Sequence, residues 1–390
     1  MELDRLRAET PGTKHGVHLG AAGASLPPDA VLEAVRDHLE LEARIGGYDA
    51  QRVRQGSLLA VYEDVASLVG GRAEEIALLE NASAAWAQAF YALPMKPGDR
   101  ILTSEAEYAA NCVAFLQRRK RDGIRVEVVP SDGAGALDVA ALESMIDERV
   151  RLIAVSWIPT NGGLVNPAEA IGKVAKAHGV PYLLDACQAV GQMPVDVGRL
   201  GCDFLSATGR KFLRAPRGTG FLWIRHDRLR ALEPVMIDHF AAPWVELERY
   251  ALRDDARRFE TWESSYALRA GLGAAVRYAQ AIGLNEIQAR TWGLARSLRE
   301  RIRAIPGARV HDLGVTQCAI VSFSVAGLDP EAAVKALAKE RVFIGVSYPS
   351  NTLIDSTRRS LPLMLRASPH YYNTEDELEA LCARLERMRD

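Results

Sequence analysis

The sequence predicts an α/β protein: a large domain with a mostly parallel seven-stranded sheet, and a smaller α+β domain. Between about residues 30 and 260, seven short apolar runs alternate with helical patterns. After residue 260 the pattern changes to a long helical region followed by shorter strands and helices. Continuous apolar strands between helices indicate that both sheet faces are covered, which is typical of parallel strands. We therefore place the large domain at residues 20–260 and the small domain at residues 1–19 and 261–390.

Each predicted strand of the large domain is an apolar run of β-type residues. In chain order the runs are EIALLE, RILTSE, RVEVVPS, RLIAVSWI, PYLLDACQ, CDFLSAT and GTGFLWIR. Helical patterns follow the first four, at residues 83–93, 109–123, 138–147 and 166–179. In such sheets the ligand site lies beyond the carboxyl ends of the strands. The residues directly after each strand are therefore the first candidates for a site.

The small domain begins with a helical region at residues 265–305, which ends at Pro306-Gly307. Strand-like runs follow, namely CAIVSFSV, VFIGVSY and LMLRASP, with helical runs at residues 330–341 and 374–388. No Pro/Gly/Ser-rich linker precedes this part. We therefore expect the two domains to be tightly joined.

The composition is that of an ordinary soluble protein, with 390 residues, 25% charged residues and a formal charge of −2. This balance gives no reason to expect nucleic acid or a membrane surface as a partner. No uncharged run reaches membrane-spanning length, and the N-terminus has no apolar signal-peptide core. The five cysteines are scattered and predict neither a disulfide framework nor a metal site. We expect a cytoplasmic protein.

Asp185 directly follows the apolar strand PYLL. A carboxylate there is costly unless a positive partner meets it, and a protonated heterocyclic nitrogen would be such a partner. The alternative is that Asp185 caps a helix N-terminus.

Two further strand ends carry groups that suit an anion. Asn81 fits a helix N-cap after EIALLE, so the free amides of Ser83 and Ala84 and the Ser83 hydroxyl would face any anion there. After CDFLSA come Thr208 and Arg210, whose hydroxyl and guanidinium suit a phosphate.

Lys211 follows Arg210 directly. A lysine among cations and partly desolvated has a lowered pKa and becomes a nucleophilic amine. An amine, a carboxylate for a ring nitrogen and an anion cup together describe a site for pyridoxal phosphate.

The chain resembles the class V aminotransferase and cysteine desulfurase family, pyridoxal phosphate enzymes of fold type I. The resemblance covers nearly the whole chain. It is carried by DACQAVG, by TGRK followed by PRGTGFLW, by LRASPHYYNTEDEL and by the N-terminal HLGAAGASLPP. Segments such as IGGYDA and ATGRKFLRAPRG are similar to those of the branch that contains hercynylcysteine sulfoxide lyases and isopenicillin-N-epimerase-like proteins.

The resemblance implies roles by position. Lys211 would form the imine with the cofactor, Asp185 would pair with the ring nitrogen, and Gln188 would bond the ring oxygen. The remaining cofactor residues would be Ser83, Ala84 and Thr208 at the phosphate, Arg210 beside it, Tyr108 stacked on the ring, and Thr160 or Asn161 near the ring oxygen or the substrate. The substrate residues would be Arg366 for the carboxylate, with Gly23 and His18 in the N-terminal segment.

Departures from the family pattern shape the expected reaction. Arg210 replaces the usual histidine, and TWESS replaces a Gly-Thr that contacts phosphate from the neighbouring subunit. The segment before Arg366 carries a nucleophilic cysteine in desulfurases but contains none here. We therefore expect a C–S β-lyase that acts on an S-substituted cysteine or its sulfoxide and releases pyruvate and ammonia.

Other readings stay open at this point. An epimerase or an aminotransferase would need a second base or a second keto-acid substrate, and a non-catalytic relative would need no intact Lys211. The resemblance also implies a homodimer with the site at the subunit junction. The sequence does not identify the amino-acid substrate or the role of residues 346–365.

Overall fold

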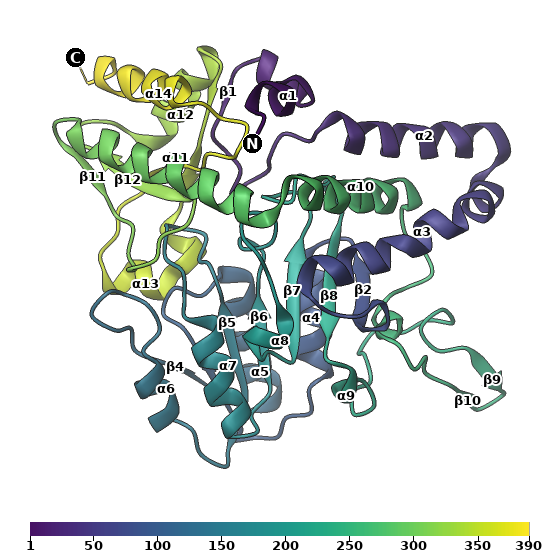
Figure 1. The fold of residues 1–390 in the computed structure, drawn as a ribbon. Helices are drawn as coiled ribbons and strands as arrows, with labels where there is room; N and C mark the ends of the chain where they lie inside the picture. The colour runs from purple at the N-terminus through teal and green to yellow at the C-terminus, as the bar shows by residue number, and fades with distance from the viewer. Residues whose placement is uncertain (390) are drawn as a thin grey trace.

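A seven-stranded sheet forms the centre of the large part of the chain (Figure 1). In a computed structural model that describes residues 1–389, the strand order is β2-β8-β7-β6-β5-β3-β4. Pairs from β4 to β7 are parallel, and β8 is antiparallel to both neighbours. The α/β prediction with a mostly parallel seven-stranded sheet is confirmed. The strands are β2 (Ile76–Leu79), β3 (Arg100–Thr103), β4 (Arg125–Val128), β5 (Val150–Ser156), β6 (Tyr182–Asp185), β7 (Phe204–Thr208) and β8 (Gly220–Ile224).

Alternation along the strands divides their side chains between two cores on opposite faces of the sheet. In β6, Leu183 packs with α4 (Ala82–Ala92) and α5 (Ala109–Asp122), and Leu184 packs with α7 (Ala168–Ala177) on the other face. Successive side chains of a strand point to opposite faces. The face to which a side chain at a strand end points therefore determines which helices it contacts.

The C-terminal part contains a four-stranded antiparallel sheet in the order β11-β12-β15-β14. Its strands are β11 (Ala308–Val310), β12 (Val321–Val325), β14 (Gly345–Ser347) and β15 (Met364–Ala367). Near it, β1 (Val17–His18) pairs in parallel with β13 (Val342–Phe343). The N-terminal segment thus lies beside the C-terminal part. The proposed domain boundaries stay a prediction.

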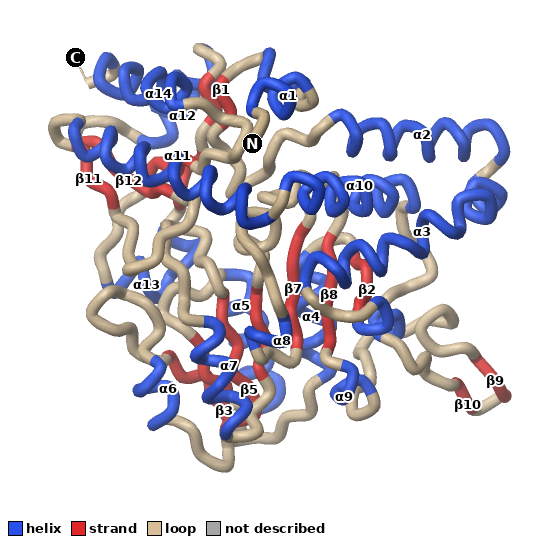
Figure 2. Tube along the Cα trace, viewed as in Figure 1, coloured by secondary structure: helices blue, strands red, loops and turns tan. Residues whose placement is uncertain are grey.

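The long helical region is two helices, α10 (Tyr266–Ile282) and α11 (Leu284–Ala304). They are separated by Gly283, whose φ of 95° lies in the left-handed region that favours glycine. The sequence pattern continues across this break, so only the backbone shows it. In Figure 2, α10 runs beside α2 (Asp29–Ile45) and α3 (Gly47–Val69), which pack against it.

A short hairpin of β9 (Trp244–Glu246) and β10 (Arg249–Tyr250) projects away from the large sheet (Figure 1). In the described part of the chain, no helix combines the length and apolar character needed to cross a membrane. The remaining elements are α1 (Leu3–Ala8), α6 (Val139–Ser144), α8 (Val197–Leu200), α9 (His226–Leu229), α12 (Pro330–Lys339), α13 (Leu353–Arg358), α14 (Glu375–Arg387) and the 3-10 helices η1 (Pro11–Lys14), η2 (Ala73–Glu75), η3 (Ala256–Phe259) and η4 (Pro349–Thr352).

Candidate active site

Polar side chains at the carboxyl ends of the central strands share one face of the sheet. Each side chain points to the same face of the sheet as an apolar residue two or four positions earlier in its strand that packs against α4 and α5. Asp185, for example, lies on the same face as Leu183. All are buried. They are Thr103, Ser156, Asp185, Ser206 and Thr208. The strand ends therefore form a polar floor beneath the first turns of the two helices.

Asp185 is buried at the end of β6, where two N–H groups hold its carboxylate. Asn111 Nδ2, on α5, donates to Oδ2 at 3.1 Å, and the backbone N–H of Cys187 donates to Oδ1 at 2.9 Å. A turn follows Asp185, with no α-helix. The helix N-cap alternative is therefore wrong, and the remaining lone pairs of the carboxylate are free to meet a ligand.

Lys211 lies half-buried in the turn after β7, three residues beyond Thr208. Burial lowers the pKa of its ammonium group, and the guanidinium groups of Arg210 and Arg366 act in the same direction. The thiol of Cys187 and the carboxylate of Asp185 oppose them. A lowered pKa leaves more of the neutral amine, which is the nucleophilic and basic form.

Arg366, on β15, forms a chain of polar contacts with Thr160 and Gln188. Its Nη1 donates to Thr160 Oγ1 at 2.8 Å and to the Thr160 carbonyl at 3.0 Å. Gln188 Nε2 donates to Thr160 Oγ1 at 3.3 Å and to the Ala22 carbonyl at 3.1 Å. Burial lowers the pKa of Arg366 to about 10, with Arg210 adding to the effect. The guanidinium remains charged at neutral pH.

The start of α4 differs from the prediction at one amide. Asn81 is the N-cap, and its Oδ1 accepts from the backbone N–H of Ala84 at 2.9 Å. The prediction that the Ala84 amide is free for an anion is therefore wrong. The Ser83 side chain is exposed there. Across from it, Thr208 Oγ1 donates to the Thr219 carbonyl at 3.2 Å.

Arg210 lies close to both Tyr108 and Gly23. Tyr108 is the N-cap residue of α5, and its side chain lies near the guanidinium groups of both Arg210 and Arg366. The Arg210 guanidinium donates to the Gly23 carbonyl. Burial lowers the pKa of Arg210, followed by repulsion from Arg217.

Two predicted residues make contacts with other parts of the chain. The ring of His18 packs 6.3 Å from that of Phe343, and its Nδ1 lies 3.4 Å from the hydroxyl of Tyr372. Asn161 Nδ2 donates to the Tyr348 carbonyl at 2.8 Å. The structure thus brings Thr160, rather than Asn161, together with Gln188 and Arg366.

Sequence reasoning missed Glu107, Asn111 and Cys187. Glu107 comes directly before Tyr108, the N-cap of α5, and Asn111 lies in the first turn of that helix, where its Nδ2 donates to Glu107. The spacing of the two residues was available in SEAEYAAN, but which strand ends they face depends on the sheet order.

The donors and charges of this site fit pyridoxal phosphate. Within the described residues, Gln188 Oε1 and Ser206 Oγ are buried without a hydrogen-bond partner, and a ligand with polar substituents would satisfy them. The Lys211 amine, with its lowered pKa, lies beside the Asp185 carboxylate. The Thr208 hydroxyl and the start of α4 lie at other strand ends. Fold and site therefore define a pyridoxal phosphate-dependent enzyme.

Comparison with known proteins agrees. The aminotransferase class-V family matches residues 17–381, and the chain belongs to this family. A probable cysteine desulfurase of Methanothermobacter thermautotrophicus is 31% identical over 396 residues, which cover 100% of this chain and 98% of that protein.

Solved structures show the same fold. The apo structure of the cysteine desulfurase of Thermococcus onnurineus has a TM-score of 0.92 and 26% identity, covering 99% of this chain and 97% of that one. A C-DES mutant with glycine covalently linked to its pyridoxal phosphate cofactor has a TM-score of 0.88 and 24% identity, covering 97% and 98%. The predictions of a fold type I enzyme of this family and of pyridoxal phosphate as its cofactor are confirmed.

Proposed function

We propose that this chain is a C–S β-lyase that acts on an S-substituted cysteine, such as a cysteine sulfoxide conjugate, and releases pyruvate and ammonia. One observation carries the proposal: at a site shared by Lys211, Asp185 and Arg366, the preceding residues 346–365 contain no cysteine. The similarity to hercynylcysteine sulfoxide lyases supports it. The name of the curated relatives, cysteine desulfurase, supports cleavage at a C–S bond of cysteine.

The cysteine-free segment is docked against the body of the protein. Asn161 Nδ2 donates to the Tyr348 carbonyl at 2.8 Å and to Thr352 Oγ1 at 3.1 Å. The backbone N–H of Asp355 donates to the Glu105 carbonyl at 3.1 Å. A loop that transfers sulfur must bring a thiolate to the substrate. This segment supplies a polar wall instead.

The five cysteines also argue against a sulfur-accepting thiolate. Burial raises the pKa of each thiol, to about 12 for Cys112 and about 11 for Cys382. Cys187 lies beside Asp185 and Lys211, and the Asp185 carboxylate raises its thiol pKa further. A neutral thiol is a poor nucleophile.

The residues of the site can perform β-elimination. Arg366 binds the substrate carboxylate with its forked guanidinium. The Lys211 amine takes the Cα proton, and that electron pair forms a Cα–Cβ double bond as the Cβ–S bond breaks. The sulfur leaves with its bonding pair, as a thiolate, or as a sulfenate from a sulfoxide. Water then converts the released enamine to pyruvate and ammonia.

Pyridoxal phosphate, when bound, supplies an electron-accepting ring that stabilises negative charge at Cα. Asp185 would face the ring nitrogen, and Gln188 would bond the ring oxygen. Ser83 and Thr208 would hold the phosphate, and Tyr108 would cover one ring face. These roles follow the resemblance, and the positions of the residues at the strand ends support them.

The experiment is a product analysis of the holoenzyme with cysteine, S-substituted cysteines and their sulfoxides. A β-lyase releases equal amounts of pyruvate and ammonia from an S-substituted cysteine. A desulfurase releases alanine from cysteine, and an epimerase or aminotransferase yields neither pyruvate nor free thiol. Alanine as the main product, or inverted substrate without cleavage, would refute the proposal.

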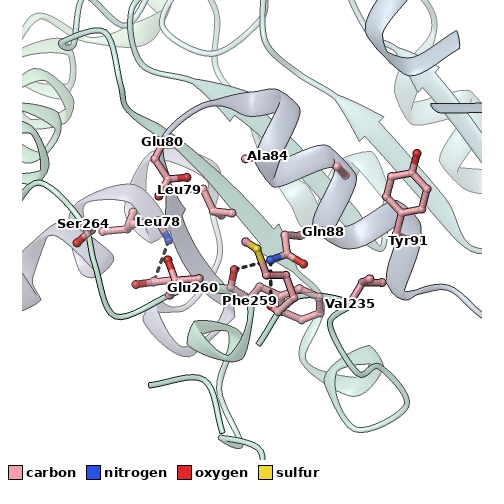
Figure 3. A pocket seen from close by; sticks show the side chains of 13 residues that line it. Leu78, Leu79, Glu80, Ala84, Gln88, Tyr91, Val235, Phe259, Glu260 and Ser264 are labelled. Atoms are coloured by element: carbon pink, nitrogen blue, oxygen red, sulfur yellow. Dashed lines mark hydrogen bonds between the residues drawn. The ribbon is translucent and has the colours of Figure 1, made fainter. Parts of the chain in front are cut away.

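We also propose a homodimer, built on two apolar features: the β9–β10 hairpin and a pocket beside α4. The hairpin of β9 and β10 exposes Trp244, Leu247 and Tyr250. Beside α4, a pocket of about 240 Å³ is lined by Leu79, Val235 and other residues (Figure 3). Large apolar side chains exposed together on one hairpin are typical of protein interfaces.

Light scattering of the purified protein tests the dimer. We expect twice the mass of 42.6 kDa and a shift toward monomer in Leu247→Asp, because Leu247 is 88% exposed. Val315→Asp is a matched control, since Val315 is 92% exposed and lies in the C-terminal part. A monomeric native protein would contradict the proposal.

A further inference from the structure

A second carboxylate is buried behind Asp185, and the proposed mechanism does not use it. Glu107, directly before Tyr108, is 1% exposed. Five donors converge on its two oxygens. Oε1 accepts from Ser156 Oγ at 2.6 Å, Asn111 Nδ2 at 2.8 Å and the Tyr108 N–H at 2.9 Å, and Oε2 accepts from the Ser156 N–H at 2.8 Å and Thr103 Oγ1 at 3.3 Å.

Asn111 joins the two carboxylates. Its Nδ2 donates to Glu107 Oε1 at 2.8 Å and to Asp185 Oδ2 at 3.1 Å. An ionised carboxylate only accepts hydrogen bonds, so the amide oxygen of Asn111 has no favourable place beside either one. Glu107 thereby determines which end of Asn111 meets Asp185.

We propose that Glu107 is a positioning residue for Asp185: through Asn111 it keeps the Asp185 carboxylate oriented and ionised, so that the proton stays on the cofactor's ring nitrogen. The inference rests on the proposed function, because it requires Asp185 to face that nitrogen.

The groups around both carboxylates also affect whether the proton stays on the ring nitrogen. Burial raises the pKa of Glu107, and Asp185 adds to the rise, whereas the hydrogen bonds from Ser156, Asn111 and Tyr108 oppose it. The other titratable groups near the pair are Lys211 and Cys187 beside Asp185, and Cys112 and Tyr182 near Glu107. Burial keeps both thiols and the phenol neutral near pH 7. Apart from the carboxylates, Lys211 is therefore the one group in this set whose charge can alter the protonation of the ring nitrogen.

The test is the ¹⁵N chemical shift of the ring nitrogen in holoenzyme reconstituted with ¹⁵N-labelled pyridoxal phosphate, followed against pH. In Glu107→Gln we expect the midpoint of deprotonation to fall by about one pH unit or more. Asn111→Ala should also move the signal toward the neutral nitrogen, because Asp185 loses the donor that favours its ionised form. The double variant should differ little from Asn111→Ala, since Glu107 acts through Asn111.

Glu75→Gln is the matched control for buried carboxylates. Glu75 is 6% exposed and accepts from Trp223 Nε1 at 3.1 Å and from the Arg72 N–H at 3.0 Å, on the β2–β8 side of the sheet. We expect it to lower the thermal midpoint of the apoenzyme without moving the nitrogen signal. An equal movement in Glu75→Gln would overturn the proposal, because the effect of Glu107→Gln would then be a general loss of stability.

Asp185→Asn separates the two proposals. If it leaves the nitrogen signal unchanged, Asp185 does not pair with the ring and the proposed site assignment fails. If Asp185→Asn moves the signal while Glu107→Gln and Asn111→Ala match the native protein, the role of Glu107 is wrong. Should Glu107→Gln fail to fold, Asn111→Ala decides alone.

Discussion

The backbone N–H of Arg214 donates to the carbonyl of Lys211 at 3.0 Å, and Arg214 adopts a left-handed φ of 64°. A residue other than glycine rarely adopts this conformation. The buried guanidinium holds it in place: Nε donates to the Leu26 carbonyl and Nη2 to Thr10 Oγ1, both at 2.7 Å. The group also lies 5.0 Å from the ring centre of Tyr371. A strained residue thus ties the lysine turn to both ends of the chain.

Arg214→Ala and Arg214→Gly should therefore differ. Both lose the buried hydrogen bonds, and alanine also keeps the left-handed strain. We expect Arg214→Ala to lower the free energy of unfolding by about 2–4 kcal/mol. Glycine adopts this φ without strain, so Arg214→Gly should lower it by about 1 kcal/mol less. Urea unfolding of the apoenzymes measures both, and equal losses would show that the left-handed φ costs nothing.

Lys211→Ala should abolish covalent attachment of the cofactor. Borohydride reduction followed by intact-mass analysis should show one cofactor adduct on the native protein and none on the variant. Turnover should fall by about 10³-fold or more, since the amine is also the proposed base. Lys173→Ala, at an exposed lysine on α7, is the control and should retain the adduct. An adduct on Lys211→Ala would place the reactive amine elsewhere.

The uptake of cofactor by the apoenzyme should depend on pH through Lys211. Attack on the aldehyde requires the neutral amine, and burial lowers the pKa of Lys211 below its ordinary 10.5. The rate should therefore rise with pH and level off below pH 10.5. Because the Arg210 charge lowers the same pKa, Arg210→Gln should move the midpoint to higher pH. Stopped-flow absorbance measures the rate, and a midpoint that stays or falls would remove Arg210 from this role.

Ser83→Ala and Thr208→Val should weaken the binding of the cofactor phosphate. We expect each to raise the Kd of the apoenzyme for pyridoxal phosphate by about tenfold, equivalent to one lost hydrogen bond to a charged group. Pyridoxal, which lacks the phosphate, is the matched ligand. Its affinity should not change, and a loss of equal size with pyridoxal would show that the two hydroxyls do not face the phosphate.

Arg366→Lys should separate charge from geometry. Lysine keeps the positive charge but lacks the fork that matches a carboxylate, so KM should rise by about tenfold or more. Thr160→Val removes the hydroxyl that accepts from Arg366 at 2.8 Å and should raise KM by a smaller factor. Initial rates with one S-substituted cysteine measure both. An unchanged KM in Arg366→Lys would exclude a forked contact with the substrate carboxylate.

The fold was predictable because its signals are local. Apolar runs such as PYLL and CDFL are short and bounded, and their alternation with helices indicates a covered, parallel sheet. The break at Gly283 was not predictable, because helical residues continue on both sides and only the backbone angle separates the helices. The free amide expected at Ala84 was wrong for a similar reason: the same Asn81 that starts the helix also occupies that amide.

The sequence alone determined the sheet, the lysine turn and the carboxylate at Asp185, because each depends on residues close together in the chain. Only the tertiary structure brought Arg366 to Thr160, 206 positions away, and placed Asn111 and Glu107 behind Asp185. The physical reason is strand order. Hydrogen bonding between strands determines which carboxyl ends lie side by side. The alternation of side chains along each strand determines which face of the sheet the side chains at those ends share.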